Sequence, residues 1–218
     1  MSAPVTGDVR VCFVGDSFVA GVGDEQHLGW AGRLAASTHA GGQALTGYNL
    51  GVRRDTSTDV LARWFSECTP RLPAGVRGGV VVSFGVNDGT LRQDDAAGST
   101  RVLTRVDPRV SVTNLLSLLE QARAARWQVL VVGPPPVDDE EHNRRTAALD
   151  TSFAAACSQQ EVVYVSVLPA LLGDDVWRRE VREGDGAHPA AEGYQRLAAL
   201  VLPVWDEWIG SLPGSSDR

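Results

Sequence analysis

The strongest constraint on the fold is a regular alternation of two sequence patterns along nearly the whole chain. Short apolar runs rich in β-branched residues favour strands, and each is followed by a longer stretch with apolar residues at helical spacing. Such alternation predicts right-handed crossovers and a mostly parallel sheet with helices on both faces. The predicted strands are 9–14, 44–50, 80–84, 129–132 and 162–165, and the predicted helices are 30–38, 57–67, 110–126, 141–160 and 190–209.

The 218 residues show no internal repeat and no linker, so we expect a single domain spanning 1–218, with a core of about 8–209 and a flexible tail at 210–218. The fold class is α/β, a three-layer α/β/α arrangement around five parallel strands. For such sheets the common strand order is 2-1-3-4-5, as in flavodoxin. The winding then reverses between strands 1 and 3, which opens a crevice at their carboxyl ends where ligands bind.

Composition excludes several classes of function. A formal charge of −7 and a pI near 5.1 oppose nucleic-acid binding, which depends on clustered cationic side chains. No apolar run approaches the ~20 residues needed to span a bilayer, so no membrane embedding is expected. Three cysteines without metal-ligand spacing favour a reducing compartment, and no secretion signal is visible at the N-terminus, which together indicate a cytoplasmic protein.

Four short segments carry the residue types that acyl-transfer chemistry uses. Three of them follow the first three predicted strands, so they should meet at one edge of the sheet, with Ser17 and Asn87 facing each other across the crevice. The fourth lies just before the last predicted helix. The segments are Gly15-Asp16-Ser17, Asn49-Leu50-Gly51, Gly85-Val86-Asn87-Asp88 and Asp185-Gly186-Ala187-His188-Pro189.

Each of these segments suggests a chemical role. A serine hydroxyl is a weak nucleophile at neutral pH, so Ser17 needs a base, and we assign this role to His188. Asp185, three residues earlier in a glycine-containing turn, would hold the imidazole in the tautomer that accepts the serine proton. The backbone N–H groups of Ser17 and Gly51 and the side-chain amide of Asn87 would stabilise an oxyanion.

The segments resemble the blocks of the SGNH (GDSL-type) hydrolase family, which carry Ser, Gly, Asn and Asp-x-x-His in this order. The resemblance covers residues 9 to about 195. It implies a flavodoxin-like fold, no cofactor, and hydrolysis of esters or thioesters by Ser17, Gly51, Asn87, Asp185 and His188. No Gly-x-Ser-x-Gly elbow occurs anywhere in the sequence, which disfavours the common α/β-hydrolase fold.

Each candidate also has a structural interpretation. Ser17 alone could cap the turn after the first strand, because serine favours such positions. Asp16 is expected to hold its turn by hydrogen bonds, and the role of Asp88 is left open. The other histidines, His27, His39 and His142, lie in polar stretches without a matching partner and are expected to be exposed.

Substrate specificity should come from the segments that frame the crevice. The stretch 89–107 shows little periodicity, and long irregular loops often form lids or binding walls. Leu91, Val102 and Leu103 in this stretch, together with Trp30, are candidate substrate-binding residues. Four arginines of the same region could contact an anionic head group, although solvated arginines on a loop are the more common case: Arg92, Arg101, Arg105 and Arg109.

The sequence therefore predicts a serine esterase that cleaves small or medium acyl esters or thioesters through an acyl-Ser17 intermediate. A carbohydrate O-acetyl esterase with the same machinery is the nearest alternative. A non-catalytic flavodoxin-like module that binds an anion in the crevice is the alternative from another class, although no Gly-rich phosphate loop follows the first strand. The expected partner is a small-molecule ester; no metal is expected, and the oligomeric state is left open.

Overall fold

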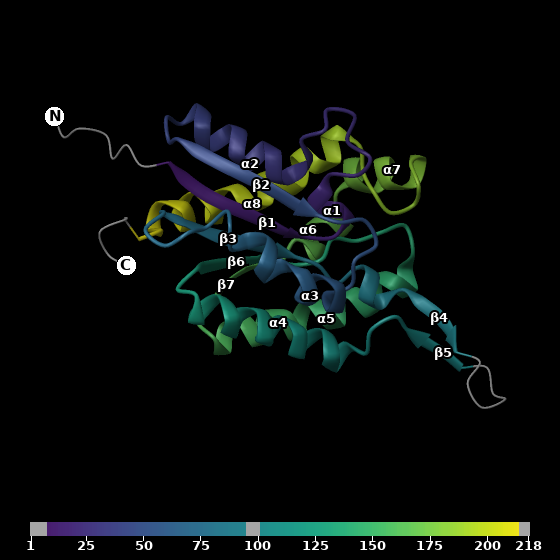
Figure 1. Cartoon of the computed structure of the whole chain (residues 1–218). Helices are drawn as coiled ribbons and strands as arrows, with labels where there is room; N and C mark the ends of the chain where they lie inside the picture. Colours follow the sequence, from purple (N-terminus) through teal and green to yellow (C-terminus); the bar gives the residue numbers. More distant parts are fainter. Residues whose placement is uncertain (1–7, 95–100, 214–218) are drawn as a thin grey trace.

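A five-stranded parallel sheet forms the centre of the protein (Figure 1). The computed structural model describes residues 8–94 and 101–213. The strands lie in the order β2-β1-β3-β6-β7, which is the predicted order 2-1-3-4-5. Their bounds are Val9–Gly15 for β1, Leu45–Gly51 for β2, Gly78–Ser83 for β3, Gln128–Val132 for β6 and Val163–Val165 for β7. The predicted fold class is confirmed.

Helices cover both faces of this sheet and make it the middle of three layers (Figure 1). On one face lie α2 and α8 with three shorter helices, and on the other lie α3, α4 and α5. The first group comprises α1 (Ser17–Ala20), α2 (Gly29–Ala40), α6 (Leu168–Leu172), α7 (Asp175–Glu183) and α8 (Ala191–Ser211), and the second comprises α3 (Ser57–Cys68), α4 (Pro108–Ala124) and α5 (Glu140–Gln159).

Strand β1 shows why the sheet carries two separate cores. Val11 and Phe13 point into the layer of α2 and α8, whereas the neighbouring Cys12 and Val14 point into the layer of α3, α4 and α5. Successive side chains of a strand alternate between faces, so a strand covered on both sides must be apolar throughout. This explains why the central strands read as continuous apolar runs rather than as an alternating pattern.

The structure differs from the sequence prediction where elements are short. Helices α1 and α6 have four and five residues, too few for a helical period to be visible. Part of the stretch 89–107 forms an antiparallel hairpin, with β4 at Leu91–Asp94 and β5 at Arg101–Thr104, where an irregular loop was expected; residues 95–100 lie outside the described part.

The C-terminal helix also departs from expectation at its end. Trp205 is fully buried, whereas its neighbour Val204 is half-buried, so the helix packs on the sheet through Trp205. The helix runs on to Ser211 and Leu212 is buried, so the predicted tail at 210–218 is wrong for its first residues. Residues 214–218 lie outside the described part of the chain.

The described helices include none that is both long and apolar enough to cross a membrane. The three cysteines are buried and unpaired. Within residues 8–94 and 101–213, no group of three His, Cys, Asp or Glu side chains is arranged to hold a metal ion.

Candidate active site

The fold brings the four segments to the carboxyl edge of the sheet. Ser17 opens α1 directly after β1, and Gly51 is the last residue of β2. Asn87 begins the short 3-10 turn η1 (Asn87–Gly89), which follows β3. Asp185 and His188 lie in the loop between α7 and α8.

Three of these residues form a continuous hydrogen-bonded chain. His188 Nε2 lies 2.8 Å from Ser17 Oγ, and His188 Nδ1 lies 2.8 Å from Asp185 Oδ2. The second oxygen of Asp185 accepts the backbone N–H groups of Ala187 and His188, at 3.0 and 2.8 Å. Serine, imidazole and carboxylate thus stand in the order in which a proton can leave the hydroxyl.

The carboxylate of Asp185 is held in its ionised form. Partial burial by itself raises the pKa of Asp185, but hydrogen bonds from the backbone N–H and imidazole of His188 and from the Ala187 N–H outweigh it and lower the pKa to about 2. Asp185 is therefore an anion at neutral pH. An anion at this place stabilises the imidazolium that forms when His188 accepts a proton.

The position of Ser17 is fixed by its neighbours in the sequence. The Asp16 side chain caps α1 by accepting the Phe18 N–H at 3.0 Å, and Gly21 ends the helix in the left-handed conformation at φ 76°. The Phe18 ring packs beside the His188 ring, with centroids 4.8 Å apart, and so supports the imidazole. Ser17 itself is only 4% exposed.

Asn87 joins the same cluster through Asp16. Its side-chain nitrogen donates to the backbone carbonyl of Asp55 at 3.0 Å and lies 3.5 Å from Asp16 Oδ2. Burial raises the pKa of Asp16 to about 7, helped by repulsion from Asp88 and Asp55 and opposed by its hydrogen bond from the Phe18 N–H. Below that pH, Asp16 is neutral and places no negative charge beside the Asn87 amide.

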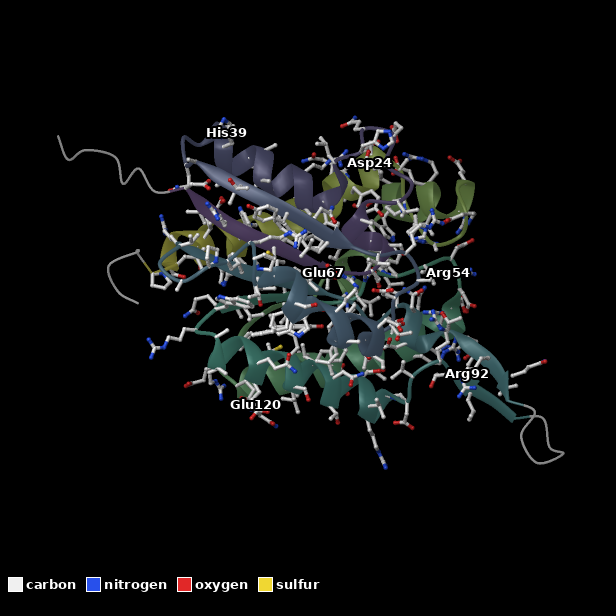
Figure 2. All side chains as sticks on the ribbon, viewed as in Figure 1. Asp24, His39, Arg54, Glu67, Arg92 and Glu120 are labelled. Carbon is white, nitrogen blue, oxygen red and sulfur yellow. The ribbon has the colours of Figure 1, made fainter. Side chains whose placement is uncertain are left out.

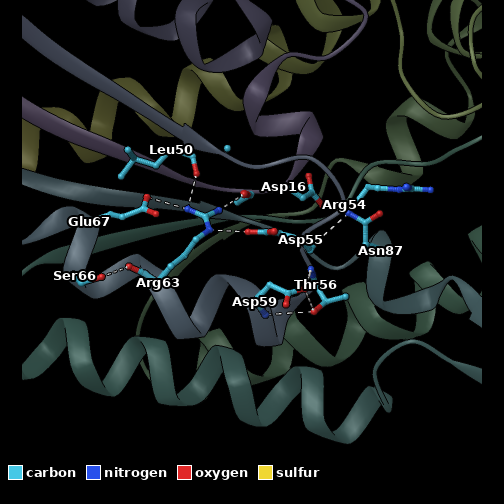
Figure 3. A network of polar contacts seen from close by, with 12 residues as sticks. Asp16, Leu50, Arg54, Asp55, Thr56, Asp59, Arg63, Ser66, Glu67 and Asn87 are labelled. Atoms are coloured by element: carbon cyan, nitrogen blue, oxygen red, sulfur yellow. Dashed lines mark hydrogen bonds and ion pairs between the residues drawn. The ribbon is translucent and has the colours of Figure 1, made fainter.

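A polar network surrounds this corner of the site (Figure 3). Arg63 donates to the backbone carbonyls of Gly15 and Leu50, at 2.8 and 2.9 Å, and so ties together the ends of β1 and β2. The same guanidinium pairs with Asp55 at 2.6 Å and with Glu67 at 3.0 Å. The sequence analysis missed Arg63, because nothing in a single helical arginine indicates that it holds two strand ends.

The backbone N–H of Gly51 makes a different contact from the predicted one. This N–H donates to Asn49 Oδ1 at 3.0 Å, so the chain's own amide occupies the donor that was assigned to an oxyanion. The Cα of Gly51 packs so tightly against α1 that a Cβ would lie 2.7 Å from the Asp16 carbonyl oxygen and closer still to the Ala20 nitrogen. This glycine therefore serves the close packing of β2 on α1.

Other candidate residues have structural roles. Asp88 is buried, and its carboxylate accepts the Ser57 N–H at 2.8 Å, which holds the start of α3 against the Asn87 turn. His142 was expected to be exposed, but it is 9% exposed and its Nε2 lies 2.9 Å from the Val86 carbonyl. Burial lowers the pKa of His142, which keeps the ring neutral.

The predicted substrate-binding residues fall into two groups. Trp30 is 1% exposed and packs edge-on against Phe13 in the core, so its assignment to a substrate wall is wrong for this structure. Its apolar surface is used to fill the space between α2 and the sheet. Leu91, Val102 and Leu103 lie on the β4–β5 hairpin, where Leu91 is 49% and Val102 is 60% exposed, and their contact with substrate stays a prediction.

Comparison with known proteins adds a family match. The profile of the GDSL-like Lipase/Acylhydrolase family matches residues 13–196, which is most of the chain. A search of the curated proteins found no match to the sequence.

Solved structures share the fold over nearly the full chain. A lipase/acylhydrolase from Enterococcus faecalis is 22% identical with a TM-score of 0.72, covering 94% of this chain and 97% of the other. The protein crystallised as TesA is 25% identical with a TM-score of 0.71, covering 91% and 99%. A mutant of an acetyl-xylooligosaccharide esterase from Geobacillus stearothermophilus is 17% identical with a TM-score of 0.68, covering 91% and 95%.

Proposed function

The chain belongs to the GDSL-like lipase/acylhydrolase family and is a serine ester hydrolase, and from this premise we propose that Ser17 cleaves small or medium acyl esters or thioesters through an acyl-enzyme. The observation that carries the proposal is the unbroken chain from Ser17 Oγ to His188 and on to Asp185, with 2.8 Å at each of the two contacts to the imidazole. The non-catalytic anion-binding alternative is thereby set aside.

In the first half of the reaction, Ser17 Oγ attacks the ester carbonyl and its proton moves to His188 Nε2. The tetrahedral adduct then collapses, the bond to the leaving oxygen or sulfur breaks, and the imidazolium returns the proton to that atom. In the second half, a water attacks the acyl-Ser17 with His188 again as the base. Asp185 stays ionised throughout and balances the imidazolium.

The negative oxygen of the adduct needs hydrogen-bond donors. We assign the Ser17 backbone N–H and the Asn87 side chain to this role, and each such donor is typically worth ~10² to 10³ in rate. Gly51 can serve as the third donor only if its N–H leaves Asn49 Oδ1. The turn after β2 offers another N–H, that of Arg54. This turn lies beside Asn87, because the backbone carbonyl of the next residue, Asp55, accepts the Asn87 side chain at 3.0 Å. The structure of a phosphonate adduct would distinguish the two by showing which N–H contacts the phosphoryl oxygen.

Labelling with a fluorophosphonate tests the covalent route without knowledge of the natural substrate. We expect a single modified peptide containing Ser17, and no labelling or ester hydrolysis by Ser17→Ala with an unchanged circular dichroism spectrum. Ser152→Ala, at an exposed serine of α5, is the matched control and should label like the wild type. Retained hydrolysis by Ser17→Ala would refute the covalent route.

A carbohydrate O-acetyl esterase is the second candidate, since the fold is shared with an acetyl-xylooligosaccharide esterase. A p-nitrophenyl ester series from acetate to octanoate, measured beside acetylated xylan, separates the two candidates. A clear preference for the acetylated sugar would replace our first choice.

A further inference from the structure

The side chain of one arginine beside the cluster has no role in the chemistry derived above. Arg54 lies in the turn after β2, where the Asp55 N–H donates to the Val52 carbonyl at 3.3 Å. The next carbonyl, that of Asp55, accepts the Asn87 side chain. Figure 3 shows Arg54 in the same polar network as Asn87, and the Arg54 side chain is exposed.

The backbone conformation of Arg54 is unfavourable for a residue with a side chain. Its φ is 69°, a left-handed value that is sterically unfavourable for residues other than glycine. The turn is nevertheless held in place, because Arg105 Nη1 donates to the Arg54 carbonyl at 2.9 Å.

The charge of Arg54 is not balanced by the protein. The adjacent Asp55 carboxylate is turned to Arg63, and no ion pair of Arg54, Arg105 or Arg145 is found among the side chains of residues 8–93 and 102–213. Arg145 donates to the Gly89 carbonyl at 2.9 Å, at the other end of the Asn87 turn. Arg105 interacts with the carboxylates of Asp59 and Asp88, and Arg145 interacts with that of Asp139. Among the described side chains, Arg54 is therefore the guanidinium beside the Asn87 turn that has no carboxylate partner, in a chain whose formal charge is −7.

The opposite side of the site carries negative charge. Asp185 is ionised and its side chain is 51% exposed. Asp138 lies close by, since its N–H donates to the Gly186 carbonyl at 2.9 Å, but its carboxylate is paired with Arg182 at 3.5 Å. The Asp185 carboxylate repels an anionic group on its own side of a bound substrate, so such a group is better placed toward Arg54. Arg92 lies at the same end of the molecule as Arg54 (Figure 2).

We propose that Arg54 selects esters that carry a carboxylate or phosphate group on the Asn87 side of the scissile carbonyl. The inference rests on the proposed esterase function and deepens it by naming the substrate class. Guanidinium groups bind carboxylate and phosphate through charge-assisted hydrogen bonds, and these are stronger than neutral ones. The anion belongs either to the acyl part or to the leaving alcohol, and the substrates of the test distinguish these sources.

The test compares each anionic ester with a neutral ester of similar shape. The acyl pair is p-nitrophenyl hemiglutarate and p-nitrophenyl valerate, and the alcohol pair is 4-acetoxybenzoate and phenyl acetate. For the wild type we expect the ratio of kcat/KM, anionic over neutral, to exceed that of Arg54→Gln by about tenfold or more in one pair. Arg54→Lys should recover part of the ratio, and added salt should lower it in the wild type.

Arg126 supplies the matched control. It is also exposed and left-handed, with φ 60°, but it precedes β6 at the other end of the sheet. Arg126→Gln should leave both ratios unchanged. If Arg54→Gln also leaves both ratios unchanged while Ser17 is labelled and neutral esters are cleaved, the anion proposal is wrong and the esterase function stands. If Ser17 is neither labelled nor active toward any ester, the proposed function itself fails.

Discussion

Replacement of Asp16 by asparagine should change how the stability of the protein depends on pH. Asp16 is 1% exposed, and its pKa is raised from 3.8 to about 7, first by burial and then by the nearby carboxylates of Asp88 and Asp55. The folded protein therefore binds a proton at this site in a pH range where the unfolded chain has lost it. Stability from this site is full in acid and is lost as the pH rises through about 7.

The size of the effect follows from the two pKa values. With a pKa of 3.8 in the unfolded chain and about 7 in the folded protein, the Asp16 proton adds about 3 kcal/mol to the free energy of unfolding at about pH 5 and almost nothing at about pH 8.5. Asp16→Asn removes this proton, but the asparagine side chain still caps α1. The difference in unfolding free energy between variant and wild type should therefore change by about this amount across the range.

Urea unfolding at several pH values, followed by circular dichroism, measures this difference. Asp139→Asn is the matched control, since Asp139 also caps a helix, α5, but is exposed, and its pKa is lowered mainly by the hydrogen bond from the His142 N–H. The stabilisation by the ionised Asp139 is lost in acid, so its contribution to the free energy of unfolding depends on pH with the opposite sign to that of Asp16. If the free energies of unfolding of Asp16→Asn and the wild type change in parallel from about pH 5 to 8.5, the conclusion that Asp16 is buried and neutral is refuted.

Three further outcomes are expected. Asn87→Ala should lower kcat by ~10² or more with a modest change in KM, because Asn87 contacts the oxyanion mainly in the transition state. Steady-state kinetics on a p-nitrophenyl ester measures both constants, and a change confined to KM would contradict this role. His188→Gln should abolish most ester hydrolysis because it removes the base that accepts the serine proton, and undiminished hydrolysis by this variant would oppose that role. Gly51→Ala should lower the melting temperature, since a Cβ collides with α1, whereas Gly210→Ala, with open space around it in α8, should not.

The sequence was most informative where a pattern repeats. Five strands and five helices were predicted from their apolar patterns, and the strand order followed from the preference of such sheets, whereas the nine-residue α7 was not predicted. Helix α1 could not be predicted in this way, since four residues form one turn and its start depends on the Asp16 side chain. The β4–β5 hairpin was missed because its exposed strands mix polar and apolar residues.

In the candidate site, too, the residues that belong to sequence motifs were predicted, and those whose roles depend on packing or backbone conformation were not. Residue types in the four segments led to Ser17, Asp185, His188 and Asn87, and the fold places these side chains in one cluster although they come from three distant parts of the chain. Trp30 was misplaced because a large aromatic side chain suits a core as well as a pocket, and only packing distinguishes the two. Arg54 gave no signal at all, because a left-handed φ cannot be read from an Arg-Arg-Asp sequence.

Close backbone contacts, rather than side-chain packing alone, set where the nucleophile lies. A Cβ on Gly15 would collide with the Ser83 carbonyl of β3, and one on Gly51 would collide with the Ala20 nitrogen of α1. The helix that carries Ser17 therefore follows directly on the central strand and rests on the end of the neighbouring one. Because Ser17 Oγ lies 2.8 Å from His188 Nε2, a shift of about 1 Å in either strand end would break the contact on which the proposed activation of Ser17 depends.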